Sequence, residues 1–390
     1  MLRLLTIIGA RPQIIKAAAI SRAIKEKFAG QVEEHILHTG QHYDDNMSEV
    51  FFRELGIPAP DYNLHVGSGS HGAMTAHIIE GVEDVLCGKW KEESRKDDWK
   101  PFDGVIVYGD TNSTLAAAVA AAKIHIPVFH IEAGLRSFNM AMPEEQNRIV
   151  CDALSSILFA PTQTALKNLE AEGVGGTVYG VRKFANGKGQ KVVLSGDVMY
   201  DNSMYFSAMA DMKSDIIERL GLSCRNFVLA TIHRPANTDN AANLHSIFRA
   251  LNDIAYSGID VILPCHPRTR KMIGNLSLVI GDLSPRLRII EPASFFEIIR
   301  LEKNARVVMT DSGGVQKEAF FYGTPCVILR PETEWVEIVD AGAGILADAD
   351  YERIMKAYEE LSGREVKFPP LFGDAHASEK ILQEILAYLG

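Results

Sequence analysis

The sequence predicts an α/β protein with two Rossmann-like domains, and three observations lead to this prediction. The chain has 390 residues, which is more than a single hydrophobic core usually organises. Short runs rich in β-branched residues recur along it, and each leads into a helical pattern, as in a doubly wound parallel sheet. The segment 173–191 interrupts this alternation with glycines and little apolar periodicity, so it is either a linker or a surface hairpin beside one. We therefore expect the boundary between the domains near residue 175.

The expected strands alternate with helices in both halves of the chain. In the first half they are Leu4–Ile8, Glu34–His38, Val105–Tyr108 and Val128–Ile131. In the second half they are Phe227–Thr231, Val261–Pro264, Arg306–Thr310 and Cys326–Leu329. Ligands of such sheets bind beyond the carboxyl ends of the strands, so we expect the active site in the cleft between the domains.

The end of the chain predicts an amphipathic helix that docks on a core. Ser378 is available near its start as an N-cap. The apolar residues that recur at helical spacing are Ile381, Leu382, Ile385, Leu386 and Leu389.

Composition and charge exclude several classes of protein. With 50 acidic and 40 basic residues the formal net charge is −10, which repels nucleic acid and anionic membranes. The longest apolar run beyond the first strand, Leu115–Ala122, is far shorter than a membrane span. Met1–Ala10 is too short for a secretory signal and is typical of a buried strand. We therefore expect a cytoplasmic protein.

The sequence gives no reason to expect a metal or a redox cofactor. The five cysteines are an odd set with no close pair, which indicates buried thiols rather than disulfides or a zinc knuckle. The segment Gly67–Gly72 matches G-x-G-x-x-G, but the preceding Asn63–Val66 is a poor buried strand. No clear strand ending in an acidic residue follows at the usual distance, so a nicotinamide site is not expected.

A strand, a tight Asp311-Ser312-Gly313-Gly314 turn and a helix follow one another in the second half. Glycines let a backbone approach a ligand, and the N–H groups at the start of a helix favour a phosphate. Alternatively, Ser312 is only an N-cap and the glycines serve the turn. We favour the phosphate site, because two successive glycines exceed what a cap needs.

A second candidate anion contact lies where the first strand meets the first helix. Arg11 and Lys16 are both placed to reach the end of the strand, where a diphosphate would be held by a guanidinium fork and a point charge. The alternative is a solvated first helical turn.

Acids and a histidine follow other strands of the expected sheets. Asp110, Glu132 and Glu144 lie in or after strand-end loops of the first half, and His233 follows a strand of the second half. Such groups converging on a cleft are typical of general acid–base catalysis. Alternatively, the acids are paired with nearby arginines, for which Arg136 and Arg148 are available. Their position at strand ends favours catalysis.

Taken together in order, these motifs resemble the non-hydrolysing UDP-N-acetylglucosamine 2-epimerases, a family with the glycosyltransferase-B architecture. The similarity runs nearly from end to end of the chain. Its motifs are Gly9-Ala-Arg-Pro, Thr39-Gly-Gln-His42, Gly109-Asp-Thr, His130-Ile-Glu-Ala-Gly-Leu-Arg136, Pro143-Glu-Glu, Ile232-His-Arg234, Ile290-Glu-Pro292 and Thr310-Asp-Ser-Gly-Gly314. In this family the C-terminal helix returns to the first domain, so the resemblance implies domains at 1–175 plus 366–390 and at 176–365.

The resemblance also implies a site. The residues implied around the sugar and the diphosphate are Arg11, Lys16, Asp110, Glu132, Glu144 and His233. Those implied around the nucleotide are Ser312, Gly313, Gly314 and Glu318, with the loop of Pro292 and Ala293 near the uracil. The further substrate-binding residues that we expect are Gln41, His42, Arg136, Arg148, Arg234, His266, Arg330 and Glu334. The expected partner is a UDP-sugar, and a homodimer is expected.

The chain departs from the family pattern at two motifs and in the segment His71–Glu80, which does not match the bacterial pattern linked to activation by a second substrate molecule. It has Glu334-Trp335-Val336-Glu337 where the family has Glu-Arg-Pro-Glu, and Pro235-Ala-Asn-Thr after the histidine motif. Such variants look like the branch that acts on modified sugars, including UDP-2,3-diacetamido-2,3-dideoxyuronates.

The expected reaction is inversion at C2 by elimination and re-addition of UDP. The C2 proton is not adjacent to a carbonyl, so C2 cannot be inverted by simple deprotonation and reprotonation. Inversion through transient oxidation of the sugar would need a nicotinamide. Elimination needs a base, a stabilised diphosphate leaving group and a proton donor on the opposite face. The resemblance leaves two rivals, a glycosyltransferase of the same architecture and an inactive nucleotide-sugar sensor.

Overall fold

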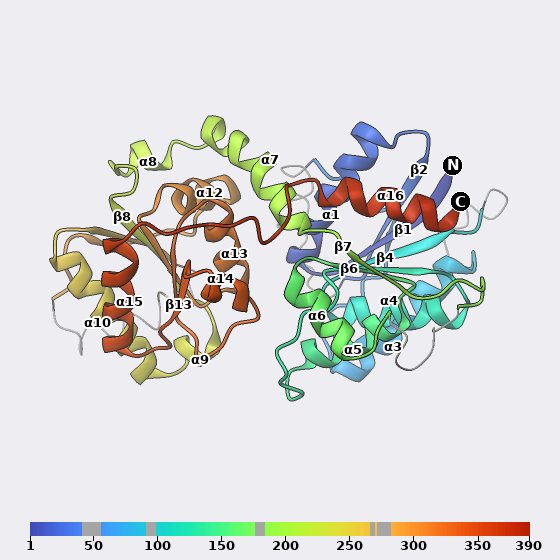
Figure 1. The fold of residues 1–390 in the computed structure, drawn as a ribbon, viewed down its shortest axis with the longest axis horizontal. Helices are drawn as coiled ribbons and strands as arrows, with labels where there is room; N and C mark the ends of the chain where they lie inside the picture. The colour runs from blue at the N-terminus through green and yellow to red at the C-terminus, as the bar shows by residue number, and fades with distance from the viewer. Residues whose placement is uncertain (41–55, 91–98, 176–183, 266–269, 271–281) are drawn as a thin grey trace. The chain divides into compact units, whose positions relative to one another are not determined.

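The computed structural model describes the chain except for residues 41–55, 91–98, 176–183, 266–269 and 271–281. It contains two compact units, which are described separately (Figure 1). The first comprises Met1–Asn202 and Leu371–Gly390, and the second comprises Ser203–Pro370. The division therefore lies later along the chain than the expected position near residue 175. The reason is that the glycine-rich segment leads into β7, which pairs with β6 inside the first unit.

The first unit is built on a parallel seven-stranded sheet with the strand order β3-β2-β1-β4-β5-β6-β7. Its strands are β1 (Leu2–Ile8), β2 (Val32–His38), β3 (Tyr62–Asn63), β4 (Gly104–Tyr108), β5 (Val128–Ile131), β6 (Ile157–Ala160) and β7 (Lys191–Leu194). Its helices are α1 (Arg11–Lys27), α3 (His71–Leu86), α4 (Asn112–Lys123), α5 (Pro143–Leu154), α6 (Gln163–Ala171) and α16 (Ala377–Leu389). The sequence analysis did not identify β3, β6 and β7, which are two to four residues long.

Small apolar residues determine the packing around the centre of this sheet. Every residue of β4 is buried, as expected for a central parallel strand with both faces covered. The neighbouring α4 has five fully buried alanines, at 116–118, 120 and 121. Because alanine has a short side chain, α4 packs closely against α3, α5 and the sheet. The carboxyl end of β4, with Gly109 and Asp110, is thereby held in a rigid setting.

The second unit is built on a parallel six-stranded sheet with the order β10-β9-β8-β11-β12-β13. Its strands are β8 (Phe227–Thr231), β9 (Asp260–Pro264), β10 (Leu287–Ile290), β11 (Val307–Thr310), β12 (Cys326–Ile328) and β13 (Gly344–Leu346). Its helices are α8 (Ile216–Arg219), α9 (Pro235–Thr238), α10 (Ala241–Tyr256), α12 (Phe295–Asn304), α13 (Gly313–Phe321), α14 (Val336–Asp340) and α15 (Tyr351–Gly363). A further helix, α7 (Val198–Lys213), contains the boundary between the units.

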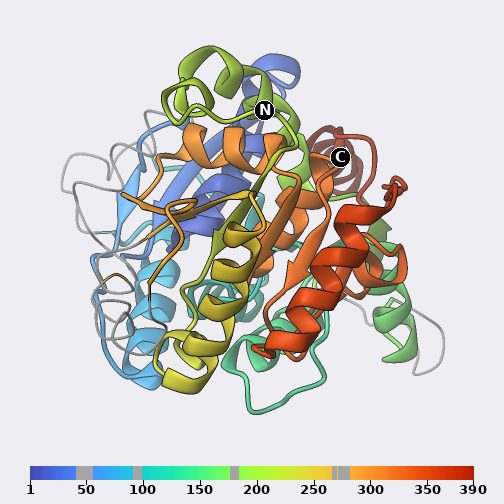
Figure 2. The same ribbon diagram turned by 90° about the vertical axis from the view of Figure 1, so that its left-hand side faces the viewer.

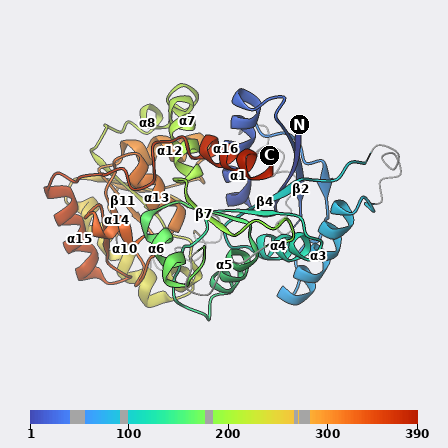
Figure 3. The same ribbon diagram turned by 45° about the vertical axis from the view of Figure 1, so that its right-hand side comes forward.

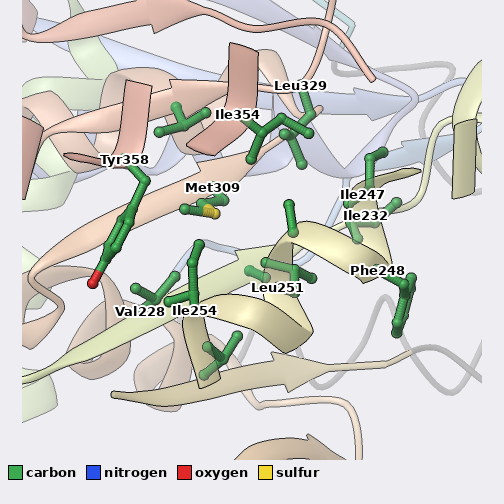
Figure 4. Close-up of a cluster of buried hydrophobic side chains, with 14 of the residues drawn as sticks. Val228, Ile232, Ile247, Phe248, Leu251, Ile254, Met309, Leu329, Ile354 and Tyr358 are labelled. Carbon is green, nitrogen blue, oxygen red and sulfur yellow. The ribbon is translucent and has the colours of Figure 1, made fainter. Parts of the chain in front are cut away.

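One face of the second sheet is covered by α10 and α15, which run side by side (Figure 2). Leu251 and Ile254 of α10 and Ile354 of α15 meet Val228 and Met309 of the sheet in a buried cluster (Figure 4). All five side chains are fully buried. The second unit therefore has a hydrophobic core of its own.

The C-terminal helix α16 returns to the first unit and packs on α1 (Figure 3). Ser378 lies in its first turn and does not act as the expected N-cap. Instead the Asp201 carboxylate accepts bonds from the backbone N–H groups of Ala377 and Ser378, at 3.1 and 2.8 Å, and from the Ser378 hydroxyl. An acid from another helix therefore satisfies this helix start. No helix in the described part of the chain is long and apolar enough to span a membrane.

Candidate active site

The predicted site residues fall into two groups, one at the strand ends of each unit. Gln41, His42 and His266 lie outside the described residues. The first group contains the proposed acids and the cations near them, and the second contains the histidine and the glycine-rich turn.

The loop between β1 and α1 is fixed from inside by Gln13. The buried Gln13 side chain accepts bonds from the backbone N–H groups of Gly9 and Ala10, at 2.9 and 3.1 Å. Its amide donates to the Tyr108 carbonyl at the end of β4 and to the Thr114 hydroxyl. The exposed Arg11, at the start of α1, is thus held at the same edge of the sheet as the end of β4.

Lys16 and Glu132 form an ion pair above the end of β4. Their side chains are only 13% and 11% exposed, which keeps the pair largely out of water. Gly109 lies beneath them, because a Cβ added there would be 3.2 Å from Lys16 Nζ and 3.3 Å from Glu132 Oε2. Gly109 has φ +64° and Glu132 has φ +70°, a left-handed conformation that is unusual for a non-glycine residue. Strain of this kind occurs preferentially at functional sites.

Asp110 and Glu144 have different environments. The Asp110 carboxylate is 30% exposed and forms an ion pair with Arg148. For this acid the structure therefore shows the alternative in which the carboxylate is paired with a nearby arginine. Glu144 is exposed in the first turn of α5. Its neighbour Glu145 is buried, binds Arg148 and accepts bonds from two backbone N–H groups of the preceding loop. Glu145 was missed by the sequence analysis, although its place beside Pro143 in a first helical turn was a signal for it.

Arg136 has a structural environment in the first unit. Its guanidinium is 1% exposed and lies 2.8 Å from Asp152, while its other nitrogens bind Glu172 at 2.6 and 2.7 Å. Burial lowers the pKa of Arg136, but the bonds and charges of Glu172 and Asp152 outweigh burial and raise it. A guanidinium held in this way is committed to protein contacts rather than exposed to a ligand.

In the second unit, His233 is organised by a buried acid, Asp311. Its ring Nδ1 lies 3.2 Å from Asp311, and the backbone N–H groups of His233 and Arg234 and the Asn237 amide also bind this carboxylate. Burial raises the pKa of Asp311, but these hydrogen bonds outweigh burial and lower it. Asp311 is fully buried whereas the His233 side chain is 58% exposed, so the acid presents the imidazole to solvent. The sequence analysis noted Asp311 in the turn but did not identify this role.

The turn after β11 leads directly into the start of α13. Ser312 is the N-cap of α13 and accepts a bond from the Val315 N–H at 3.5 Å, so the N-cap role is confirmed. The next two residues, Gly313 and Gly314, supply the first N–H groups of the helix, which have no partner within it. A cap and an anion site are therefore compatible here.

Glu334 lies beside Gly313 and is close to two arginines. A Cβ added at Gly313 would lie 3.3 Å from Glu334 Oε1. Glu334 binds Arg330 at 2.7 Å and lies 3.9 Å from Arg234. Burial raises the pKa of Glu334, but the charges of these arginines outweigh it and lower the pKa. The structure thus brings together Arg234, Gly313, Arg330 and Glu334, four of the expected site residues.

The Pro292–Ala293 loop precedes α12, and Glu318 lies beside this helix. Glu318 is half-buried in α13 and adjoins Glu302, a fully buried acid of α12. Burial raises the pKa of Glu302 well above its usual range, and the neighbouring Glu318 carboxylate adds to this effect. Pro292 and Ala293 precede Ser294, which caps α12 and bonds reciprocally with Glu297.

Comparison with known proteins gives consistent results. A family model described as UDP-N-acetylglucosamine 2-epimerase matches residues 23–386. UDP-2,3-diacetamido-2,3-dideoxy-D-glucuronate 2-epimerase from Pseudomonas aeruginosa is 45% identical over 98% of this chain and 99% of that protein. UDP-N-acetylglucosamine 2-epimerase from Methanocaldococcus jannaschii is 38% identical over 99% of each chain.

Solved structures agree. The Methanocaldococcus jannaschii UDP-GlcNAc 2-epimerase in complex with UDP-GlcNAc and UDP has a TM-score of 0.80 and 37% identity, covering 99% of this chain and 100% of that one. The Neisseria meningitidis enzyme bound to UDP-GlcNAc has a TM-score of 0.81 and 28% identity, with the same coverage. The predicted class, two Rossmann-like domains of glycosyltransferase-B architecture, is confirmed. The chain therefore belongs to the UDP-N-acetylglucosamine 2-epimerase family of isomerases.

Proposed function

We propose that this protein inverts C2 of a UDP-N-acetylhexosamine by eliminating UDP and adding it back. The observation that carries the proposal is the group of three acids at one edge of the first sheet, of which Glu132 is paired with Lys16. Family membership supports the same reaction.

The acids supply the proton transfers. A base removes the C2 proton, the electron pair forms the C1–C2 double bond, and the C1–O bond breaks to release UDP with its electrons. Glu132 is held beside the Lys16 ammonium in a largely buried setting, so Glu132 is our candidate for the base. Asp110 and Glu144 are the candidates for the acid that protonates C2 on the opposite face.

Release and return of UDP require stabilisation of the diphosphate. The N–H groups of Gly313 and Gly314 and the positive end of the α13 dipole fit a phosphate. Arg234 and the exposed His233 imidazole supply further hydrogen-bond donors in the same unit. Arg11 is exposed at the strand ends of the first unit and is a further candidate.

The decisive experiment follows the reaction by proton NMR in deuterated water. An epimerase acting by elimination converts the UDP-sugar to an equilibrium mixture with deuterium at C2 and no acceptor present. A glycosyltransferase would leave the substrate unchanged without an acceptor, and an inactive sensor would bind it without exchange. Either result would contradict the proposal.

We propose further that the substrate is a modified sugar of the 2,3-diacetamido-2,3-dideoxyuronate type. The Pseudomonas aeruginosa relative, which is named for such a substrate, shares 45% identity, whereas the UDP-N-acetylglucosamine 2-epimerase of Escherichia coli shares 28%. Parallel assays with UDP-GlcNAc and the diacetamido uronate test this. A higher kcat/KM for UDP-GlcNAc would contradict this substrate and leave the elimination mechanism intact.

The proposal includes a cytoplasmic homodimer, on the sequence arguments given above. Sedimentation of the purified protein tests the oligomeric state, and a monomeric mass at assay concentrations would contradict it.

A further inference from the structure

The three acids proposed to transfer protons come from three different elements of the first unit. Asp110 follows β4, Glu132 follows β5, and Glu144 begins α5. Proton transfer is sensitive to misplacement of the reacting groups by about 1 Å. The elements that carry the acids must therefore be held in a fixed relation to one another.

A buried histidine of β5 connects all three elements. The ring of His130, which is fully buried, has Nε2 at 2.8 Å from the carbonyl oxygen of Gly109, directly before Asp110. Its Nδ1 lies 2.7 Å from Asp152 Oδ1, on α5. A carbonyl oxygen and an ionised carboxylate only accept hydrogen bonds, so both ring nitrogens donate and His130 is an imidazolium. Burial lowers the pKa of His130, but the interactions with Cys151 and Asp152 outweigh burial and raise it to about 10.

Asp152 holds the chain on both sides of Glu132. Its Oδ1 faces His130, and its Oδ2 accepts bonds from the Gly134 N–H at 3.2 Å and from Arg136 at 2.8 Å. Glu132 lies midway between His130 and Gly134 in the sequence and has φ +70°. A left-handed backbone at such a residue costs about 1–2 kcal/mol and persists only where its surroundings fix it. The bonds to Asp152 on either side of Glu132 supply that constraint.

The burial of this network argues against a purely stabilising role. The side chains of His130, Asp152 and Arg136 are at most 1% exposed. Removing ions from water is unfavourable, and apolar side chains of similar volume often stabilise a core equally well or better. Directional bonds between fixed atoms, however, define a position, which apolar contacts do less well.

We propose that the His130–Asp152 ion pair is the positioning device of the proton-transfer acids. His130 fixes Asp110 through the Gly109 carbonyl and Glu132 through β5, while Asp152 fixes the loop after Glu132 and α5, which carries Glu144. Neither residue contacts substrate in this inference. It rests on the proposed function, because it presupposes that these acids transfer protons.

The test uses His130→Gln, Asp152→Asn and the double variant in the full chain. We expect kcat to fall about 10²-fold in each single variant, with KM and UDP affinity little changed, because alignment is lost and binding is not. Because the two residues act as one unit, the kcat of the double variant should fall no further than that of the worse single variant.

His35→Gln is the matched control. His35 lies on β2 between the carboxylates of Glu33 and Asp61, at 3.1 and 3.5 Å, and should retain wild-type kcat.

Several outcomes would overturn the inference. The first is that the single variants keep the wild-type kcat per folded molecule and differ only by a lower melting temperature. The second is that the fold-decrease in kcat of the double variant equals the product of the two single fold-decreases. If His130→Gln does not fold, ¹⁵N NMR of histidine-labelled wild-type protein at pH 8 decides, since a neutral buried imidazole would refute the bridging geometry.

Asp110→Asn, Glu132→Gln and Glu144→Gln separate the two proposals. If these three variants remain active, the proposed function is wrong. If they lose activity while the His130 and Asp152 variants keep it, only the positioning role is wrong.

Discussion

At the scale of single residues, the three acids proposed to transfer protons have different environments. Glu132 lies beside a lysine in a largely buried setting, Asp110 is paired with Arg148, and Glu144 is exposed. Three carboxylates at one sheet edge therefore differ in the partners that stabilise their charge. This difference allows separate roles as base and acid.

Replacing these acids by their amides tests those roles. Asp110→Asn, Glu132→Gln and Glu144→Gln should each lower kcat roughly 10²- to 10⁴-fold, the usual contribution of a positioned proton-transfer group. UDP affinity should stay near that of the wild type, since the proposed phosphate donors are mainly in the second unit. Steady-state kinetics and calorimetry measure both quantities. Near wild-type rates in all three variants would rule out carboxylate catalysis.

Glu302 provides a test of pH dependence. Its pKa in the folded protein is raised above the ordinary value of 4.5, so above that pH the folded state retains a proton that the unfolded state releases. The free energy of unfolding should therefore fall as pH rises from about 4.5 towards the raised pKa, by up to about 1.4 kcal/mol per pH unit.

Glu302→Gln removes this titration and should flatten the pH dependence, making the variant the more stable protein at neutral pH. Urea unfolding between pH 5 and about 8 measures the difference. The exposed Glu352→Gln is the control and should follow the wild-type curve. Parallel curves for wild type and Glu302→Gln would contradict a neutral Glu302.

At the scale of elements, helix starts perform two different functions here. The start of α13 offers the N–H groups of Gly313 and Gly314, whereas the start of α16 is satisfied by Asp201. The first is suited to a ligand, and the second attaches the C-terminal helix to the first unit.

Gly313→Val should weaken UDP binding by about tenfold, which corresponds to about 1.4 kcal/mol. The new side chain would crowd Glu334 and the approach to the first N–H groups of α13, while the fold should change little. Titration calorimetry gives the affinity. Gly363→Val, at the end of α15 where a Cβ meets nothing within 4 Å, should bind UDP like the wild type. Equal affinities in the two variants would contradict the phosphate site.

Asp201→Asn should destabilise the first unit by about 1–3 kcal/mol, because a charged acceptor of three hydrogen bonds is lost. Urea unfolding measures the change, and limited proteolysis shows whether the C-terminal helix is released. The exposed Asp374→Asn, in the same C-terminal segment, should have little effect. An unaltered stability in Asp201→Asn would show that packing on α1 alone holds α16.

At the scale of the whole molecule, the two units differ in whether they are formed by one segment of the chain or by two. The second is a single segment, Ser203–Pro370, with its own sheet and core, whereas the first needs the returning residues Leu371–Gly390. A continuous segment with its own core can fold independently.

We therefore expect residues 203–370 to fold as an isolated fragment and to bind UDP more weakly than the full chain. Circular dichroism and calorimetry on the fragment test this. A fragment of residues 1–202 is the comparison and should be unstable without the C-terminal helix. Failure of 203–370 to fold would show that its stability depends on the first unit.

The sequence by itself determined the class of the fold and most of the strands that carry the site. Apolar periodicity and strand-end glycines are local signals, and they located Asp110, Glu132, His233 and Ser312 at the ends of four strands. Short strands such as β6 and β7 gave too few residues for a periodic pattern, so the glycine-rich segment before β7 was taken as the boundary between the units.

Only the tertiary structure decided which polar groups that are distant in the sequence meet. His130 and Asp152 are 22 residues apart, His233 and Asp311 are 78 apart, and Asp201 and Ser378 are 177 apart. No local pattern joins such residues, because their contact depends on strand order and on how helices cross the sheet. Burial then determines which charges must be paired, since an unpaired ion in the core is strongly unfavourable.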